Sequence, residues 1–385
     1  MKKICYIVTI SLTIKAFFIP QLQYLAENGY DVSVICSPDE ELQALLGPKV
    51  RFIPVNIPRG LSVGGSMKTI SALKKVFKKE KFDMVQYSTP NAALYASLAA
   101  SAAKIPVRNY HLMGFRYLGA SGLGRKLLKC IEKLTCKKST SIECVSPSNL
   151  EFGSKEKIFK KEKATVVWNG SSGGIDLARF CYEKGAKLKE EKRNELGIKD
   201  TDFVYGFVGR ITRDKGVVEL LSAFEKVHAK RTDTRLVLVG NLDENHGFQA
   251  ETLEKMKSSL DVIHITQKLD IENFYPIFDV LVLPSYREGF GNVVIEAQAM
   301  GVPVIVSDIP GPIDAMIDGE TGVKVPPMHV DELVTAMQDA WMFQEKGFSK
   351  KAVAFVREAF DSKTLCEKIL QRKQILLNDN KKQEE

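Results

Sequence analysis

Residues 279–306 read DVLVLPSYREGFGNVVIEAQAMGVPVIV. An apolar run ends at Leu283, a loop with two glycines follows, a helical pattern ends at Gly301, and a second apolar run begins at Pro303. Two strands joined by a helix are parallel, because the chain must cross over before the second strand can start. We therefore predict a parallel sheet covered by helices.

The same alternation of strand and helix runs along the whole chain. A helix is expected at Phe17–Asn28, closed by Gly29. We predict strands at Ile4–Val8, Asp31–Cys36, Met84–Tyr87, Val107–Tyr110, Ile142–Val145, Phe203–Val208, Arg235–Val239, Val262–Ile265, Asp279–Leu283 and Pro303–Val306. This order indicates an α/β protein built from two Rossmann-like, doubly wound domains.

The length of 385 residues also favours two domains, because one hydrophobic core rarely supports so long a chain. A glycine- and serine-rich stretch, WNGSSGGIDLARF, and a charged one, YEKGAKLKEEKRNELG, separate the halves. The boundary is expected within residues 170–200, and we assign residues 1–185 to the first domain and 186–359 to the second. In such pairs of sheets, ligands are expected at the carboxyl ends of the strands.

The formal net charge of +8 is unevenly distributed. Lys and Arg far outnumber Asp and Glu in residues 1–185, whereas the acidic residues prevail in residues 186–385. A basic half can contact nucleic acid, an anionic membrane surface or a phosphorylated substrate, and it can equally be a solvated lysine-rich surface.

Seven cysteines without CxxC pairs argue against disulfides and zinc sites, and they favour a reducing cytoplasm. The N-terminal apolar run imitates a signal peptide, but Lys15 interrupts it, so we predict a buried strand there. The apolar stretch Ala92–Ala103 is shorter than the roughly 20 residues that span a bilayer. No integral membrane segment is therefore expected.

The strongest candidate site lies in Pro284–Ile305. Glycines at the entrance of a helix allow a ligand to approach the backbone, and the free N–H groups of the helix N-terminus attract an anion. Glu296 lies one turn beyond Asn292 and could accept hydrogen bonds from two ribose hydroxyls, while Glu288 in the loop could reach a sugar. Two glutamates at this spacing are often only solvated, but Gly-Phe-Gly between them favours a binding site.

A second candidate site is FVYGFVGRITRDKGVVELLSAF, Phe203–Phe224. A strand runs into Gly209, and Arg210 and Lys215 lie on the turn before the next helix. Arg donates two parallel hydrogen bonds and Lys is a point charge, so the pair could bind one diphosphate. No Walker A pattern is present, and a surface Arg and Lys is the alternative interpretation.

Together, GRITRDKG and EGFGNVVIEAQAMGVPVI resemble family 4 of the retaining glycosyltransferases, which have the GT-B fold. VSPS at Val145–Ser148, NGSSGGIDLARF at Asn169–Phe180 and DGETGVKV at Asp318–Val325 are similar to the same family. The resemblance extends from the first strand to about Val325 and is closest to the branch that builds capsular and other surface polysaccharides.

The resemblance implies roles for individual residues. Arg210 and Lys215 would hold the donor diphosphate, Glu296 the ribose, and Glu288 with the backbone of Phe290–Val293 the donor sugar. The predicted catalytic residues are thus Arg210, Lys215, Glu288 and His111, and the predicted donor-binding residues are Gly209, Phe290, Gly291, Asn292, Val293 and Glu296. A final helix at about 360–378 would pack back on the first domain.

Two positions depart from the family pattern. The family often has a Gly-Gly loop after its first strand, where this chain has TISLTIKAFFIP. It also often has a His directly before a glycine near the donor sugar, whereas Met113 precedes Gly114 here and His111 stands two residues earlier. His111 is therefore a candidate with a structural alternative.

The resemblance further implies a reaction that needs no metal or cofactor, with the charges of Arg210, Lys215 and a helix N-terminus in place of a metal. We expect a nucleotide-sugar donor, in particular UDP-N-acetylhexosamine, a polyprenyl-diphosphate-linked glycan as acceptor, and no nucleic acid. The basic segments Gly122–Lys138 and Lys74–Lys81 could attach the protein to the anionic inner face of the plasma membrane, or could be solvated helix surfaces.

Three other functions remain open from the residues. A nucleotide-sugar epimerase or a glucan phosphorylase could use the same fold, and a phosphorylase would carry a lysine-bound pyridoxal group. A nucleic-acid-binding protein could use the basic half, but no helix-turn-helix, zinc-finger or RNP pattern is present.

Overall fold

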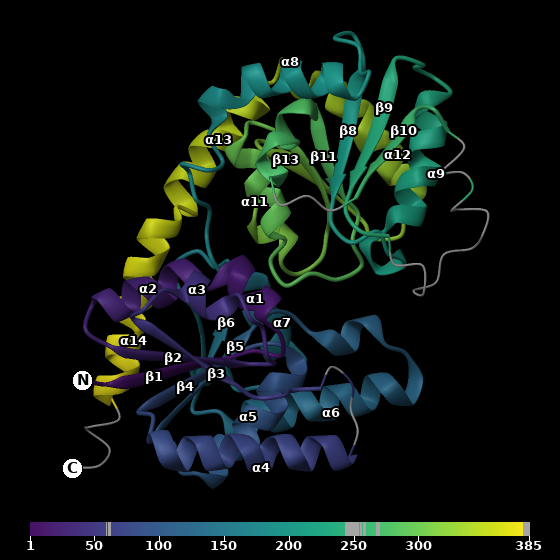
Figure 1. Cartoon of the computed structure of the whole chain (residues 1–385). Coiled ribbons are helices and arrows are strands. Elements are labelled where there is room, and N and C mark those ends of the chain that lie inside the picture. The colour runs from purple at the N-terminus through teal and green to yellow at the C-terminus, as the bar shows by residue number, and fades with distance from the viewer. Residues whose placement is uncertain are drawn as a thin grey trace. The chain divides into compact units, whose positions relative to one another are not determined.

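The computed structural model describes residues 1–58, 60, 63–242, 254, 256, 259–266 and 270–379. The chain forms two compact units, Met1–Gly174 with the residues from Ser362 onward, and Ile175–Asp361 (Figure 1). The first unit thus ends within the expected range of 170–200 but before the assigned residue 185. The reason is that the Ile175 N–H already donates to the Phe360 carbonyl of the second unit, at 2.8 Å.

The sheet of the first unit is parallel throughout, with the strand order β3-β2-β1-β4-β5-β6-β7 in the described part of the chain. Its strands are β1 (Lys3–Ile7), β2 (Asp31–Cys36), β3 (Val50–Pro54), β4 (Met84–Tyr87), β5 (Val107–Leu112), β6 (Ser141–Cys144) and β7 (Ala164–Val166). Its helices are α1 (Ser11–Phe17), α2 (Ile19–Glu27), α3 (Leu42–Leu46), α4 (Val63–Glu80), α5 (Pro90–Ala102), α6 (Gly122–Lys138), α7 (Pro147–Lys155) and α14 (Ser362–Asp379).

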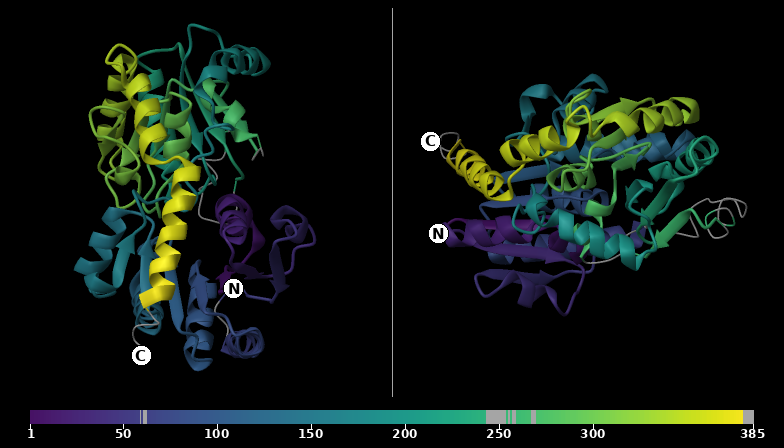
Figure 2. Two further views of the ribbon diagram at one scale, coloured as in Figure 1. Left: turned by 90° about the vertical axis from the view of Figure 1, so that its left-hand side faces the viewer. Right: turned by 90° about the horizontal axis from the view of Figure 1, so that it is seen from above.

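Both faces of this sheet are buried, as a near-continuous apolar strand requires. In β1, Cys5 and Ile7 pack with residues of α4 and α5, whereas Ile4 and Tyr6 pack with α1, α2 and Leu377 of α14. Figure 2 shows α14, in yellow, lying along the first unit, where it packs against α2. The C-terminal helix therefore completes the core of the first unit.

The second unit has a parallel sheet with the order β10-β9-β8-β11-β12-β13 in its described residues. The strands are β8 (Phe203–Val208), β9 (Thr234–Val239), β10 (Val262–Ile265), β11 (Val280–Leu283), β12 (Val304–Ser307) and β13 (Gly322–Val325). The helices are α8 (Gly185–Glu195), α9 (Val217–His228), α11 (Asn292–Ala299), α12 (Val330–Asp339) and α13 (Phe348–Ala359). The fold class expected from the sequence, two doubly wound α/β domains, is confirmed.

The helix predicted at Phe17–Asn28 is confirmed as α2, which begins two residues later and ends one residue earlier. A separate helix that was not predicted, α1, precedes it and ends at Phe17. Pro20 lies in the first turn of α2, where its missing N–H is tolerated, and it could not continue a helix from Ser11. The stretch TISLTIKAFFIP, where the family often has a Gly-Gly loop, is therefore mostly helical here.

Among the described residues, no helix combines the length and apolar character needed to cross a membrane. The helix α6 is amphipathic in a different way from that expected. Leu128 and Ile131 pack on the core, whereas Leu123, Leu127 and Leu134 are 83%, 57% and 38% exposed. Helical spacing would place Leu127, Leu128, Ile131 and Leu134 on one face, but in the structure Leu128 and Ile131 face the core and Leu127 and Leu134 are exposed.

Candidate active site

The candidate residues of the second unit gather at the point where its strand order reverses. The chain lays down β8, moves outward to β9 and β10, and returns to add β11 on the other side of β8. The loops that follow β8 and β11 consequently leave neighbouring strands at the same sheet edge. Such a switch point is where doubly wound sheets form a ligand crevice.

The loop after β8 is held close to the loop after β11. Gly216, which starts α9, has φ +72°, and a Cβ there would lie 2.0 Å from the Pro284 carbonyl oxygen. Only glycine fits this approach. Lys215, directly before it, is thereby placed next to the loop that carries Glu288.

Lys215 and Glu288 form an ion pair with 2.5 Å between Nζ and Oε1. Ser285 donates its hydroxyl to the same carboxylate oxygen at 2.9 Å. The side chains of Lys215 and Glu288 are only 19% and 11% exposed, so water and salt screen this ion pair weakly. The two residues, predicted separately from two motifs, are thus in direct contact.

Several cations lie near the carboxylate of Asp214, in the loop after β8. Arg287 binds its carboxylate at 2.8 Å. Burial alone would raise the pKa of Asp214, but the Thr212 hydroxyl and the charges of Arg287, Arg210 and Lys215 bring it below the ordinary value. Three cations therefore act on one small region at the switch point.

Arg210 and Glu296 line one cavity of about 200 Å³. Arg210 is exposed, and its side chain has no ion-pair partner among the described residues. The cavity is lined by Val208, Gly209, Arg210, Val239, Gly240, Asn241, Ile271 and Glu296. A guanidinium and a carboxylate on the walls of one cavity suit a ligand with both an anionic group and hydroxyls.

Glu296 is fixed within α11 by a buried neighbour. The Tyr275 hydroxyl donates to Oε2 of Glu296 at 2.5 Å. Burial raises the pKa of Glu296 above its ordinary value, while the Tyr275 hydrogen bond and the charge of Arg179 act to lower it. The carboxylate is thus held in place and partly protected from protonation.

The N-terminus of α11 follows Gly291, which has φ +89° and starts the helix at Asn292. Phe290 is buried, with its ring 5.3 Å from that of Phe360. The side chain of Phe290 therefore supports the core, and Phe290 can offer a ligand only its backbone. The N-terminus of a helix, with its partial positive charge, suits an anion.

His111 lies in the first unit, on β5. Its Nε2 is 3.4 Å from the Ser172 hydroxyl, and its buried Nδ1 has no partner among the described residues. Burial lowers the pKa of His111 to about 4, so the ring is neutral at physiological pH. The small cavity beside it also contains Glu143 and Lys373 of α14.

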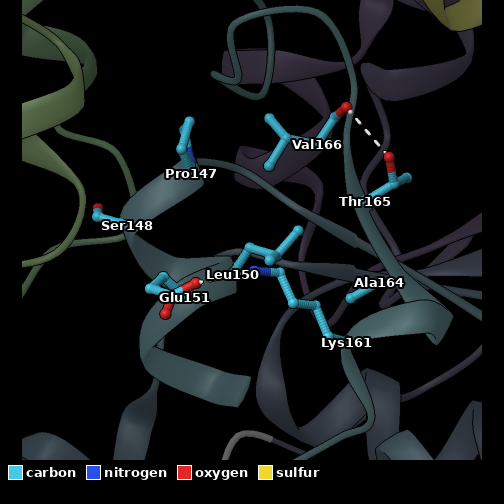
Figure 3. Close-up of a pocket in the computed structure, with 8 residues that line it drawn as sticks. All are labelled: Pro147, Ser148, Leu150, Glu151, Lys161, Ala164, Thr165 and Val166. Carbon is cyan, nitrogen blue, oxygen red and sulfur yellow. Dashed lines mark hydrogen bonds and ion pairs between the residues drawn. The ribbon is translucent and has the colours of Figure 1, made fainter. Parts of the chain in front are cut away.

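A further cavity of the first unit, of about 580 Å³, lies next to the VSPS motif (Figure 3). Pro147 and Ser148 begin α7 on one side, and Thr165 and Val166 of β7 lie on the other. Its two charged residues, Glu151 and Lys161, form an ion pair at 3.2 Å. The charges lining this cavity are therefore balanced.

Sequence reasoning missed Tyr275, Ile271, Gly240 and Asn241. Tyr275 lies in the apolar run NFYPIF and looks like an ordinary core residue. Gly240 follows β9 as Gly209 follows β8, and a Cβ on Gly240 would lie 1.8 Å from the Gly209 carbonyl oxygen. The glycine that directly follows β9 could have indicated from the sequence that Gly240 lies close to Gly209. Among the described residues, no group of three or more His, Cys, Asp or Glu is arranged to hold a metal ion.

Two family models match the chain. The model described as "Glycosyl transferase 4-like" matches residues 3–146, and "Glycosyl transferases group 1" matches residues 189–353. The second match contains Arg210, Lys215, Glu288 and Glu296. The two matches fall on the two units of the structure.

Curated relatives align over most of their length. The capsular polysaccharide biosynthesis glycosyltransferase CapM of Staphylococcus aureus is 32% identical over 84% of this chain and 83% of its own. The UDP-Gal:alpha-D-GlcNAc-diphosphoundecaprenol alpha-1,3-galactosyltransferase of Escherichia coli is 29% identical over 76% and 75%. The N,N'-diacetylbacillosaminyl-diphospho-undecaprenol alpha-1,3-N-acetylgalactosaminyltransferase of Campylobacter jejuni is 30% identical over 80% and 81%.

Among solved structures, the sucrose-phosphate synthase of Thermosynechococcus elongatus is similar over 98% of this chain and 100% of its own. The TM-score is 0.79 at 19% sequence identity. This similarity identifies the fold as GT-B.

Proposed function

Because the chain belongs to the family of group 1, family 4-like glycosyltransferases, we propose that it is a retaining, metal-independent enzyme of capsule or other surface polysaccharide synthesis. It would move a sugar from a nucleoside diphosphate to a polyprenyl-diphosphate-linked glycan. The observation that supports this most is the cavity shared by Arg210 and Glu296, beside the Lys215–Glu288 ion pair.

In this proposal the second unit binds the donor. Arg210 and Lys215 neutralise the diphosphate, the N-terminus of α11 adds N–H donors, and Glu296 accepts hydrogen bonds from the ribose hydroxyls. Lys215 is paired with Glu288 in the structure, so the donor would take over part of that charge and leave Glu288 for the sugar. UDP-N-acetylhexosamine is the proposed donor, in keeping with relatives named for UDP-galactose and for N-acetylgalactosamine transfer.

The reaction breaks the bond between the anomeric carbon and the β-phosphate oxygen. The acceptor hydroxyl attacks the same face of the sugar, and its proton passes to the departing phosphate oxygen. Negative charge grows on that phosphate in the transition state, where fixed cations and helix N–H groups stabilise it without reorganisation. Arg210, Lys215 and the start of α11 supply this stabilisation, and His111 could contribute only as a neutral hydrogen-bonding ring.

The first unit is the proposed acceptor-binding part. On α6, the exposed Leu123 and Leu127 are flanked by the exposed Lys126, Lys133 and Lys137. Exposed leucines among lysines suit the boundary of an anionic membrane, where the lipid part of the acceptor would also lie. We therefore propose a peripheral position on the inner face of the plasma membrane.

Ligand-induced stabilisation tests donor binding. A thermal-shift series with UDP, GDP, ADP and their sugars should show a higher melting temperature with UDP and its sugars, because a ligand that binds only the folded state stabilises it. Arg210→Ala should abolish this increase. No response to any nucleoside diphosphate at millimolar concentration would overturn the proposed function.

Vesicle flotation tests the membrane contact. The protein should float with vesicles that contain anionic lipid and not with neutral ones, and Lys126→Gln with Lys133→Gln should weaken this association. Lys187→Gln on α8, an exposed lysine of the second unit, is the matched control. Equal behaviour of both variants and wild type would exclude α6 as the docking surface.

A further inference from the structure

Packed aromatic side chains support the Oε2 oxygen of Glu296 through Tyr275. Tyr275 is fully buried and comes from a short 3₁₀ turn, Tyr275–Ile277. Its ring lies 6.1 Å from that of Phe180 and 6.1 Å from that of Phe278. The aromatic contacts leave the phenol no freedom to turn away, so its hydroxyl reaches Glu296 from a fixed position.

An ion pair extends this support toward the surface. Arg179 binds Glu272 at 2.8 Å, and both charges act on the Glu296 carboxyl. Glu272 belongs to the turn Ile271–Asn273, whose first residue lines the cavity. Arg179 and Phe180 end the motif NGSSGGIDLARF, so this motif contributes the groups that back Glu296.

Only one oxygen of the Glu296 carboxylate is engaged by this support. Tyr275 donates to Oε2, and no described residue donates a hydrogen bond to Oε1. Burial raises the pKa of Tyr275 well above its ordinary value, so its hydroxyl remains a donor at every physiological pH. The arrangement is therefore one-sided: one oxygen is held by the protein and the other is available to a ligand.

We propose that Tyr275 is a positioning residue for donor recognition, which holds Oε2 of Glu296 so that the carboxylate meets the two ribose hydroxyls of the nucleotide in a fixed orientation. This inference rests on the proposed function, in which Glu296 binds the ribose. Tyr275 does not touch the nucleotide, and its effect passes through Glu296 alone. It should thus influence recognition of the ribose and leave that of the diphosphate unchanged.

A ligand pair separates this role from a structural one. Calorimetry would measure the affinities of wild type for UDP and for 2′,3′-dideoxy-UDP, and wild type should prefer UDP because Glu296 loses its partners in the analogue. In Tyr275→Phe this preference should fall by about tenfold, with the affinity for the dideoxy analogue retained. Tyr205→Phe is the matched control, because Tyr205 is another buried tyrosine of the second unit, whose hydroxyl donates to the Met337 carbonyl at 2.8 Å.

The outcomes distinguish three failures. If wild type prefers UDP and Tyr275→Phe keeps the full preference, or if the variant loses affinity for both ligands equally, the positioning role of Tyr275 is overturned and the donor proposal stands. If wild type binds both ligands equally, Glu296 does not bind the ribose, and the roles proposed for Glu296 and Tyr275 are both overturned. If wild type binds neither ligand, the proposed function itself is overturned.

A pH series provides a second measurement that does not depend on Tyr275→Phe folding well. Glu296 binds hydroxyl donors more strongly as a carboxylate than as a neutral acid, so UDP affinity falls on acidification through its pKa. Arg179→Gln removes a charge that lowers this pKa, and should move the fall to higher pH, whereas Glu272→Gln removes one that raises it, and should move the fall to lower pH. The phosphates of UDP titrate alike in all variants, so equal profiles for both variants would contradict the support described here.

Discussion

The two sheets of the molecule have the same strand order around their first strand, but different residues occupy the loops at that point. In both, the first strand lies between the second and the fourth, so each sheet has a switch point. At the switch point of the second unit, Arg210, Lys215 and Glu288 gather in the loops. At that of the first, Thr9 and Thr89 bind one another, with 2.8 Å between their hydroxyl oxygens. The topology thus provides the crevice, and the loop residues decide what it can bind.

The first unit instead contains a buried ion pair in its core. Lys373 of α14, 1% exposed, binds both oxygens of Glu143 on β6, at 2.7 and 2.9 Å, and Gln86 on β4 at 2.7 Å. Burial lowers the pKa of Lys373, and the Glu143 charge opposes this. The Lys373–Glu143 pair therefore joins the C-terminal helix to the sheet, whereas Arg210 of the second unit lines a cavity.

The largest expected effect concerns this buried pair. Lys373→Met should destabilise the first unit by about 3–5 kcal/mol, because it leaves Glu143 buried without its main partner. Urea unfolding would measure the loss, and UDP affinity of the folded protein should be unchanged. Combining Lys373→Met with Glu143→Gln should recover part of the stability, since no uncompensated charge remains. A Lys373→Met variant as stable as wild type would show that the pair does not hold α14.

In the second unit, we expect removal of a cation to reduce activity. Lys215→Ala should reduce turnover by about 2.7–4 kcal/mol of transition-state stabilisation, roughly a hundredfold to a thousandfold, as one charge on the leaving phosphate is lost. Steady-state kinetics with the donor would show it as a fall in kcat. Lys189→Ala is the matched control, because Lys189 also pairs with a carboxylate of this unit, Asp279 at 3.2 Å. Similar turnover in both variants would contradict the proposed role of Lys215 in stabilising the leaving phosphate.

Much of the fold could be predicted because buried parallel strands are short apolar runs. β2, β4, β8 and β10 have the predicted bounds. The edge strands β3, β7 and β13 were missed, because residues such as Arg51, Thr165 and Lys324 make them look like loops. Edge strands are covered on fewer sides, so their sequences need less apolar character.

For the candidate site, the sequence identified the loops but not what supports them. Arg210 and Glu296 could be proposed because they belong to the motifs GRITRDKG and EGFGNVVIEAQAMGVPVI, and the structure brings them to one cavity. The Tyr275 contact joins residues 21 positions apart through a turn, and no local pattern encodes it. The pairing of Lys215 with Glu288 was equally invisible, because each motif by itself suggested a ligand partner.

The smallest expected effect concerns a buried carboxyl that, unlike Glu143, has no cation. Glu132 of α6 is 5% exposed and accepts a hydrogen bond from the Tyr110 hydroxyl at 2.7 Å, and no described residue forms an ion pair with it. Burial raises the pKa of Glu132 from 4.5 to about 7. Its contribution to stability is therefore complete below about pH 4.5 and is lost as the pH rises through about 7, because the folded state must then bury a charge.

Glu132→Gln keeps the shape and the acceptor oxygen of this side chain but does not titrate. The variant should match wild type near pH 4 and exceed it by about 3 kcal/mol at pH 8, measured by urea unfolding at each pH. Glu156→Gln is the control of opposite sign, since the Lys129 hydrogen bond lowers the pKa of Glu156 and its removal can only reduce stability above the unfolded pKa. If the gain of Glu132→Gln were independent of pH, it would come from packing, and the contrast between a paired and an unpaired carboxyl within the first unit would not hold.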